Sequence, residues 1–139
     1  MTKLPQVRDY MDTTVPTVTP DMEILKAVDF LLKSKVTGAP VVDADGALVG
    51  ILTEKDCLRL LATGHDGKFP TGTVRDFMHV HVETIKPDTN IYFVAGLFLS
   101  RNFRRYPVVD NGRLVGAITR FDILRVIEAA LMERRQSQE

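Results

Sequence analysis

The stretch Val7-Arg8-Asp9-Tyr10-Met11 returns 67 residues later as Val74-Arg75-Asp76-Phe77-Met78. Pro40-Val41-Val42-Asp43 returns in the same way as Pro107-Val108-Val109-Asp110. Beyond this point the offset falls to 66, because the following turn is one residue longer in the first copy, and surface turns tolerate such differences. The chain therefore contains a duplicated unit. Two units of this size usually bury their apolar faces on each other, which predicts a ligand site in the crevice between them.

Each copy has the same order of sequence patterns. An extended segment, at residues 15–18 and 82–85, precedes apolar residues at helical spacing, and two short apolar runs around a turn and a second helical pattern follow. This order predicts strand, helix, strand, strand and helix in each copy, and hence an α/β (α+β) fold. The predicted core-facing residues of the first helix in the two copies are Ile24, Ala27, Val28, Leu31, Leu32 and Ile91, Val94, Ala95, Phe98, Leu99.

The unit boundaries follow from the repeat and from turn-forming residues. Residues 63–72 are rich in glycine and include a proline, so they are predicted to be a connector. The first unit then covers residues 5–62 and the second covers residues 73–131. Residues 132–139 are polar and are predicted to form the fraying tip of the last helix.

The composition excludes several classes of protein. In 139 residues, 18 Lys and Arg balance 18 Asp and Glu, which gives no electrostatic case for nucleic acid or an anionic membrane. The start has no apolar segment typical of a signal peptide, and no run approaches the roughly 18 apolar residues that span a bilayer. We therefore expect a cytoplasmic protein. Cys57 is the one cysteine, which excludes an internal disulfide and a multi-cysteine metal site.

One motif occurs in both copies at the end of the second apolar run. Gly50-Ile51-Leu52-Thr53-Glu54-Lys55-Asp56 and Gly116-Ala117-Ile118-Thr119-Arg120-Phe121-Asp122 share glycine, two apolar residues, threonine, any two residues and aspartate. Glycine allows a backbone or a ligand to approach closely, and the threonine offers a hydroxyl where helix amides are unpaired. A phosphate would be stabilised there, and the carboxylate could accept hydrogen bonds from a ribose diol. The same spacing is also typical of a capping box, and the two roles are compatible.

With these motifs the sequence resembles a tandem pair of cystathionine-β-synthase (CBS) domains, called a Bateman module. The resemblance covers about residues 5–131 and rests on Asp-Tyr-Met and Asp-Phe-Met, on both Pro-Val-Val-Asp segments and on the Thr-x-x-Asp motifs. It implies two tandem CBS units packed as an intramolecular pseudo-dimer, with an adenosine nucleotide in the cleft between them. It also implies that the threonine contacts ribose or phosphate, the aspartate the ribose hydroxyls, and the backbone before Pro-Val-Val-Asp the adenine edge. The implied ligand-binding residues are Thr37, Gly38, Ala39, Thr53 and Asp56 in the first copy, and Arg105, Tyr106, Thr119, Arg120 and Asp122 in the second.

Arginines distinguish the second copy from the first. Arg101, Arg104 and Arg105 precede the strand, and Arg120 follows the threonine, so several guanidinium groups could converge on a phosphate. This favours Thr119 and Asp122 as the better mononucleotide site. The alternative is that the arginines are solvated or pair with surface carboxylates.

Other chemistry finds little support in the sequence. His79-Val80-His81 could be half of a metal site, but zinc needs three or four ligands and only distant His65 or Glu83 could add one. No grouping of nucleophile, base and acid is evident. We therefore expect no enzyme activity, no metal and no required cofactor.

The first helix of the second copy is apolar on every face, since Phe93 and Leu97 lie off its core stripe with Gly96 between them. This predicts a homodimer through the helices at residues 21–35 and 88–102, as the resemblance also implies. The alternative is burial beneath the connector or the last helix.

The sequence thus predicts a stand-alone sensor that binds an adenine nucleotide. AMP is the favoured ligand, ADP or ATP would compete with it, and the sensor would act on an unidentified regulated enzyme or transporter. The alternatives are another adenosyl ligand (S-adenosylmethionine, NAD or a cyclic dinucleotide) and a ligand-free dimerisation scaffold.

Overall fold

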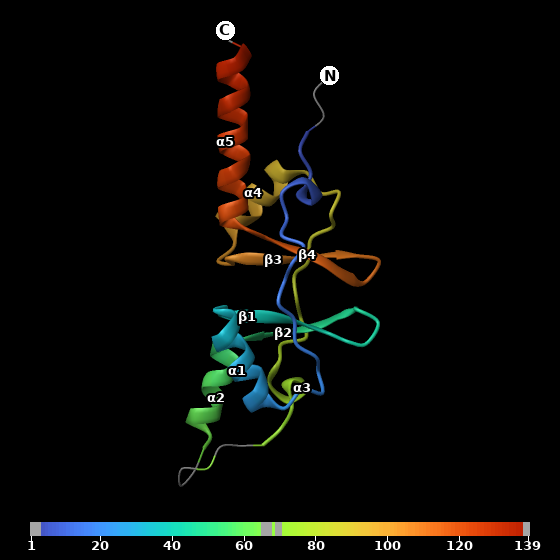
Figure 1. Ribbon diagram of the computed structural model, residues 1–139, viewed down its shortest axis with the longest axis vertical. Coiled ribbons are helices and arrows are strands. Elements are labelled where there is room, and N and C mark those ends of the chain that lie inside the picture. The colour runs from blue at the N-terminus through green and yellow to red at the C-terminus, as the bar shows by residue number, and fades with distance from the viewer. Residues whose placement is uncertain (1–3, 65–67, 69–70, 138–139) are drawn as a thin grey trace. The chain divides into compact units, whose positions relative to one another are not determined.

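The structure is a computed structural model that describes residues 4–64, 68 and 71–137 (Figure 1). It contains both helices and short strands, as predicted. The elements in chain order are η1 (Val7–Asp9), α1 (Ile24–Ser34), β1 (Gly38–Val42), β2 (Leu48–Thr53), α2 (Glu54–Ala62), α3 (Val74–Phe77), α4 (Ile91–Ser100), β3 (Arg105–Asp110), β4 (Arg113–Thr119) and α5 (Arg120–Ser137). His65 and part of the predicted connector, residues 65–67 and 69–70, lie outside the described residues, as do residues 138–139 of the predicted helix tip.

The described residues form two compact units, and each unit contains the opening segment of the other sequence copy. Unit 1 consists of residues 4–14, 83–111 and 115–137, and unit 2 consists of the described residues within 15–82 together with 112–114. The short helix η1 of the first copy therefore belongs with α4, β3, β4 and α5. Helix α3 of the second copy belongs in turn with α1, β1, β2 and α2.

Backbone hydrogen bonds hold each opening segment in place. In unit 1, Val7 N donates to Thr89 O at 2.9 Å, and Ile91 N donates to Pro5 O at 3.0 Å. In unit 2, Val74 N donates to Met22 O at 2.9 Å. Because Val7 and Val74 are fully buried, each opening segment adds an apolar residue to the core of its unit.

An antiparallel hairpin forms the centre of each unit. In unit 2, β1 pairs with β2 so that Gly38 faces Thr53 and Val41 faces Gly50. In unit 1, β3 pairs with β4. On the outer edge of β2, Ile51 forms an antiparallel bridge with His79. On the outer edge of β4, Ala117 forms one with Asp12. Each hairpin thus gains a third segment from the other sequence copy.

The strand predicted at the start of each copy is reduced to one bridging residue. Val18 pairs in parallel with Val41 in unit 2, and Ile85 pairs with Val108 in unit 1. The next step of a parallel ladder needs an N–H two residues further on, where Pro20 and Pro87 have none. The pairing therefore stops after one residue.

Each unit has its own apolar core, built from the helices and the hairpin beside them (Figure 1). The predicted core-facing stripes are confirmed for six residues, which are buried: Ile24, Ala27 and Leu31 of α1 and Ile91, Val94 and Phe98 of α4. They are wrong for Leu32, which is 72% exposed, and for Leu99, which is 91% exposed. Both lie eight residues after the first core position. At 3.6 residues per turn this places them about 80° around the helix, at the margin of the stripe.

Helix α5 continues from the end of β4 through Ser137, so the described part of the predicted helix tip is helical and exposed (Figure 1). Among the helices of the described residues, none is both long enough and apolar enough to cross a bilayer.

Candidate ligand-binding half-sites

In unit 2, the motif at residues 50–56 forms a capping box at the start of α2. Thr53 is the N-cap, and its N–H and hydroxyl both donate to Asp56 Oδ2 at 2.9 Å. Asp56 N donates back to Thr53 Oγ1 at 3.3 Å. The capping interpretation is therefore correct for the first copy, and one carboxylate oxygen of Asp56 is used by the cap.

Unit 1 has the same arrangement at the start of α5. Thr119 N and Thr119 Oγ1 donate to Asp122 Oδ2 at 2.8 and 3.0 Å, and Asp122 N donates to Thr119 Oγ1 at 3.3 Å. The Thr-x-x-Asp pattern recurs at α3, where Thr73 N donates to Asp76 Oδ2 at 2.9 Å. Because the third case lies outside the motif, this spacing by itself indicates a helix cap and not a ligand.

The second carboxylate oxygen distinguishes the two units. Asp122 Oδ1 accepts a hydrogen bond from Arg125 Nη2 at 3.2 Å, and Asp56 Oδ1 accepts one from Arg59 Nη2 at 3.3 Å. Asp56 Oδ1 has a further contact, with His79 Nδ1 at 2.9 Å. The side chain of Asp122 remains 10% exposed, whereas that of Asp56 is fully buried. Neither arginine was among the predicted site residues, although Arg59 and Arg125 lie at matching positions, each three residues after the aspartate of its copy.

The motif glycines leave room for backbone. A Cβ atom at Gly50 would lie 2.6 Å from the carbonyl oxygen of His79, and one at Gly116 would lie 2.7 Å from that of Asp12. The close approach expected from these glycines is therefore made by the bridging segments of the other sequence copy.

The residues before Pro-Val-Val-Asp are arranged differently in the two units. In unit 2, Thr37 is exposed and its carbonyl accepts a hydrogen bond from Glu54 N at 2.8 Å, Gly38 is half-buried, and Ala39 is 2% exposed. In unit 1, Arg105 is exposed and Tyr106 is 2% exposed. The side chains of Ala39 and Tyr106 thus belong to the cores, which leaves only their backbone to meet a ligand.

Tyr106 lies in an aromatic cluster of unit 1. Its ring centroid is 5.0 Å from that of Phe98 and 5.5 Å from that of Phe103. Its buried hydroxyl has no hydrogen-bond partner among the described residues. Burial and the Glu83 carboxylate raise the pKa of Tyr106, and Arg101 acts in the opposite direction. The phenol therefore stays neutral.

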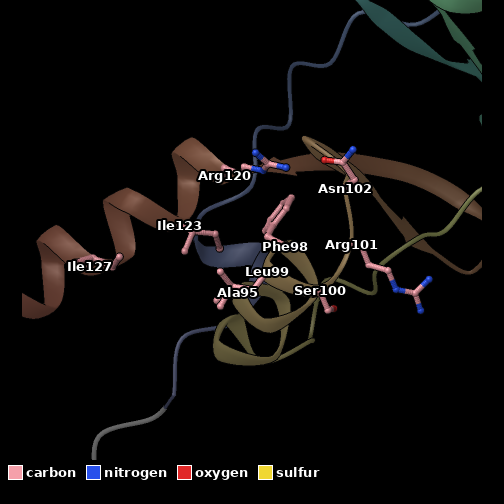
Figure 2. A pocket seen from close by; sticks show the side chains of 9 residues that line it. All are labelled: Ala95, Phe98, Leu99, Ser100, Arg101, Asn102, Arg120, Ile123 and Ile127. Carbon is pink, nitrogen blue, oxygen red and sulfur yellow. The ribbon is translucent and has the colours of Figure 1, made fainter.

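The arginines of unit 1 do not all converge. Arg101 Nη1 lies 2.9 Å from Glu83 Oε1, and its side chain points away from Arg120 (Figure 2). Arg120 Nε donates to the carbonyl of Phe103 at 3.2 Å, while Arg105 is exposed. Arg120 and Arg105 remain as candidate phosphate ligands, whereas Arg101 is neutralised by a carboxylate.

A groove of about 630 Å³ lies between α4 and α5 of unit 1 (Figure 2). Its apolar wall includes Leu99, Ile123 and Ile127, and Ser100, Asn102 and Arg120 add polar groups. Of the predicted site residues only Arg120 lines it. This apolar groove was not predicted from the sequence. The helical pattern assigned Leu99 to the core, and it gave no indication that Ile123 would lie opposite Leu99 in a groove.

The described residues contain no group of three His, Cys, Asp or Glu side chains that could hold a metal ion. His79, considered for a metal from its spacing to His81, instead has its Nδ1 in contact with Asp56.

Cys57 follows Asp56 in the sequence. Burial of the Cys57 thiol raises its pKa, and the negative charge of Asp56 raises this pKa further.

The model of a known family, the CBS domain, matches residues 7–63 and again residues 74–129, so that each copy of the duplicated unit has one match. The chain belongs to the CBS domain family. The resemblance inferred from the sequence is thereby confirmed, and the matches comprise two tandem CBS domains.

Known CBS proteins resemble the chain over most of its length. The crystal structure of CBSX2 from Arabidopsis thaliana in complex with AMP is 33% identical, with a TM-score of 0.76, and the match covers 93% of this chain and 98% of that one. The CBS domain pair of protein MJ0100, in complex with 5′-methylthioadenosine and S-adenosyl-L-methionine, is 30% identical, with a TM-score of 0.72 and coverage of 92% and 99%. Protein MJ1225 of Methanocaldococcus jannaschii is 32% identical over 121 residues, which are 87% of this chain and 42% of that protein. The chain thus spans less than half the length of that relative.

Proposed function

We propose that this CBS pair is a non-catalytic regulatory module that binds an adenine nucleotide, AMP in preference to ADP and ATP. The observation that supports this most strongly is the carboxylate of Asp122. One of its oxygens caps α5, the other accepts one hydrogen bond from Arg125, and the side chain is 10% exposed. A ribose hydroxyl is a donor suited to that oxygen, and the crystallised CBS pair of CBSX2, which is 33% identical, is in complex with AMP.

The residues around Asp122 supply groups for the rest of the ligand. The first amides of α5, an 18-residue helix, favour an anion near Thr119. Arg120 and Arg105 add positive charge that a phosphate would meet. The backbone at Arg105 and Tyr106 is proposed to contact the adenine edge, and Thr37, Gly38, Ala39 and Thr53 would act in the same way in the half-site of Asp56.

One observation favours a second candidate ligand. Because Arg101 is paired with Glu83, the cationic groups near Asp122 are fewer than the sequence suggests. An adenosyl ligand with less negative charge, such as S-adenosylmethionine, would then compete better, and MJ0100 binds S-adenosyl-L-methionine. NAD and a cyclic dinucleotide belong to the same class of alternatives.

We also propose that the module forms a homodimer through the helices at residues 21–35 and 88–102. On α4, Tyr92, Phe93 and Leu99 are 59%, 62% and 91% exposed, and a Cβ atom at Gly96 would meet nothing within 4 Å. On α1, Leu25 is 47% exposed. Apolar surface of this extent is typical of an interface. Such a dimer could present a ligand-dependent surface to a regulated enzyme or transporter in the cytoplasm.

Calorimetric titration with AMP, ADP, ATP, S-adenosylmethionine and NAD tests the proposed ligand. We expect micromolar binding of AMP and a loss of roughly tenfold or more in Asp122→Ala, since hydrogen bonds to a charged group contribute about 1.5–3 kcal/mol. Asp76→Ala is the matched control, because Asp76 makes the same cap at α3 outside both half-sites. Circular dichroism checks that each variant is folded. A folded wild type that binds none of these ligands would instead support the scaffold alternative.

A further inference from the structure

We infer that His79 closes the half-site of Asp56, so that the chain binds its nucleoside ligand at Asp122 and leaves Asp56 unoccupied. The inference rests on the proposed function and adds the residue that makes the two half-sites unequal. That residue comes from the opening segment of the second sequence copy, which lies in unit 2.

The two carboxylates accept matching sets of hydrogen bonds, and one further side chain contacts Asp56. Each accepts hydrogen bonds from the N–H and the hydroxyl of its threonine and from the arginine three residues later. Only Asp56 has a further contact among the described residues, His79 Nδ1 at 2.9 Å from Oδ1. The half-sites thus differ at the oxygen that a ribose hydroxyl would need.

An ionised carboxylate offers about four acceptor positions on its two oxygens. At Asp56 three hydrogen bonds and the His79 contact use them all, and the side chain is fully buried. At Asp122 three hydrogen bonds leave one position, and the side chain is 10% exposed. A ligand hydroxyl can therefore reach Asp122 without displacing a protein group, whereas at Asp56 it must first displace the imidazole.

The backbone holds His79 where its ring meets Asp56. His79 exchanges two hydrogen bonds of 2.9 Å with Ile51 on the edge of β2, and Gly50 allows that close approach. Asp12 has the same place in unit 1, where it exchanges two hydrogen bonds of 2.9 Å with Ala117.

The side chain of Asp12 cannot occupy an acceptor position of Asp122 in the way that His79 occupies one of Asp56. A carboxylate has no proton to donate to another carboxylate. Asp12 Oδ1 instead accepts a hydrogen bond from Thr14 N at 2.9 Å, within its own turn. The exchange of histidine for aspartate at matching backbone positions is thus what separates the closed half-site from the open one.

Calorimetric stoichiometry with AMP, on the full chain, tests this inference. We expect the wild type to bind one AMP per chain, with binding lost in Asp122→Ala and retained in Asp56→Ala. His79→Ala should raise the stoichiometry to two, because it frees Asp56 Oδ1. His81→Ala is the matched control, an exposed histidine two residues along the same segment, and should leave the stoichiometry at one.

If His79→Ala does not fold, the reciprocal variant Asp12→His still tests the inference. Asp12→His places an imidazole on the equivalent backbone of unit 1 and should weaken the Asp122 site by about tenfold. Two AMP molecules per wild-type chain would overturn the inference while the proposed function stands. A stoichiometry that stays at one in folded His79→Ala would also overturn it. No AMP binding by the wild type or by either histidine variant would overturn the proposed function, and the inference with it.

Discussion

At the residue scale, Gly50 and Gly116 are required by neighbouring backbone. An added methyl group would lie 2.6 Å from His79 O or 2.7 Å from Asp12 O, so the bridging segment would have to shift. We predict that Gly50→Ala and Gly116→Ala each lower the free energy of unfolding by about 1–3 kcal/mol, the usual cost of overpacking. Urea denaturation measures the change.

Gly96→Ala is the control for both variants. Gly96 lies in α4 with no atom near its missing side chain, so alanine should be neutral or stabilise the helix by about 0.5–1 kcal/mol. Wild-type stability in Gly50→Ala would contradict the role assigned to His79 and its bridging segment, since that role depends on the same close approach.

At the motif residues, the local hydrogen bonds could be predicted from the sequence, whereas the long-range contacts could not. The capping box could be predicted because it depends on four consecutive residues, Thr53–Asp56 and Thr119–Arg120-Phe121-Asp122. The contact between His79 and Asp56 could not, because it depends on which strand the segment after Met78 pairs with, 23 residues from Asp56 along the chain. The spacing of His79 and His81 gave no reason to place either of them on a carboxylate, and only the fold brings His79 to Asp56.

At the element scale, the threonine caps stabilise the two helices that begin at the candidate half-sites. Thr119→Ala removes an acceptor for Asp122 N and a donor to Asp122 Oδ2. We predict a loss of about 0.5–2 kcal/mol in the free energy of unfolding, the range typical of a lost N-cap. Thr119→Ser retains the hydroxyl and should recover most of that loss in the same urea titration. Equal stability of Thr119→Ala and the wild type would show that the cap contributes little.

The helices and hairpins could be predicted because their apolar residues recur at the helical or strand period. The opening strands were predicted too long, since Pro20 and Pro87 stop the parallel pairing after Val18 and Ile85. The stripe residues Leu32 and Leu99 were assigned to the core because periodicity does not show how wide the covered face is. That width is set by the neighbouring elements, which are distant in sequence.

At the scale of the whole molecule, the exposed apolar residues of α4 predict self-association. Phe93→Glu places a charge on that surface and should convert the proposed homodimer to a monomer, since a buried unpaired charge is strongly unfavourable at an interface. Sedimentation velocity measures the change. Leu58→Glu is the control, because Leu58 is 60% exposed on α2, outside the proposed interface. A monomeric wild type, or a dimer that persists in Phe93→Glu, would contradict the proposal.

The duplication itself was visible in the sequence, but the exchange of opening segments between the two units was not. Val7 and Val74 occupy equivalent positions in their copies, and either could complete either core by apolar pattern alone. The choice depends on contacts between residues far apart in the chain, such as Val7 N to Thr89 O and Val74 N to Met22 O. This exchange is what brings His79 to Asp56 and Asp12 to the unit that contains Asp122.

A crystal structure of the chain grown with AMP would test the central claim most directly. We predict one AMP per chain, with a ribose hydroxyl within hydrogen-bonding distance of Asp122 Oδ1 and with His79 still in contact with Asp56. A ribose bound to Asp56 with the His79 ring displaced, or an AMP that contacts neither carboxylate, would contradict the account.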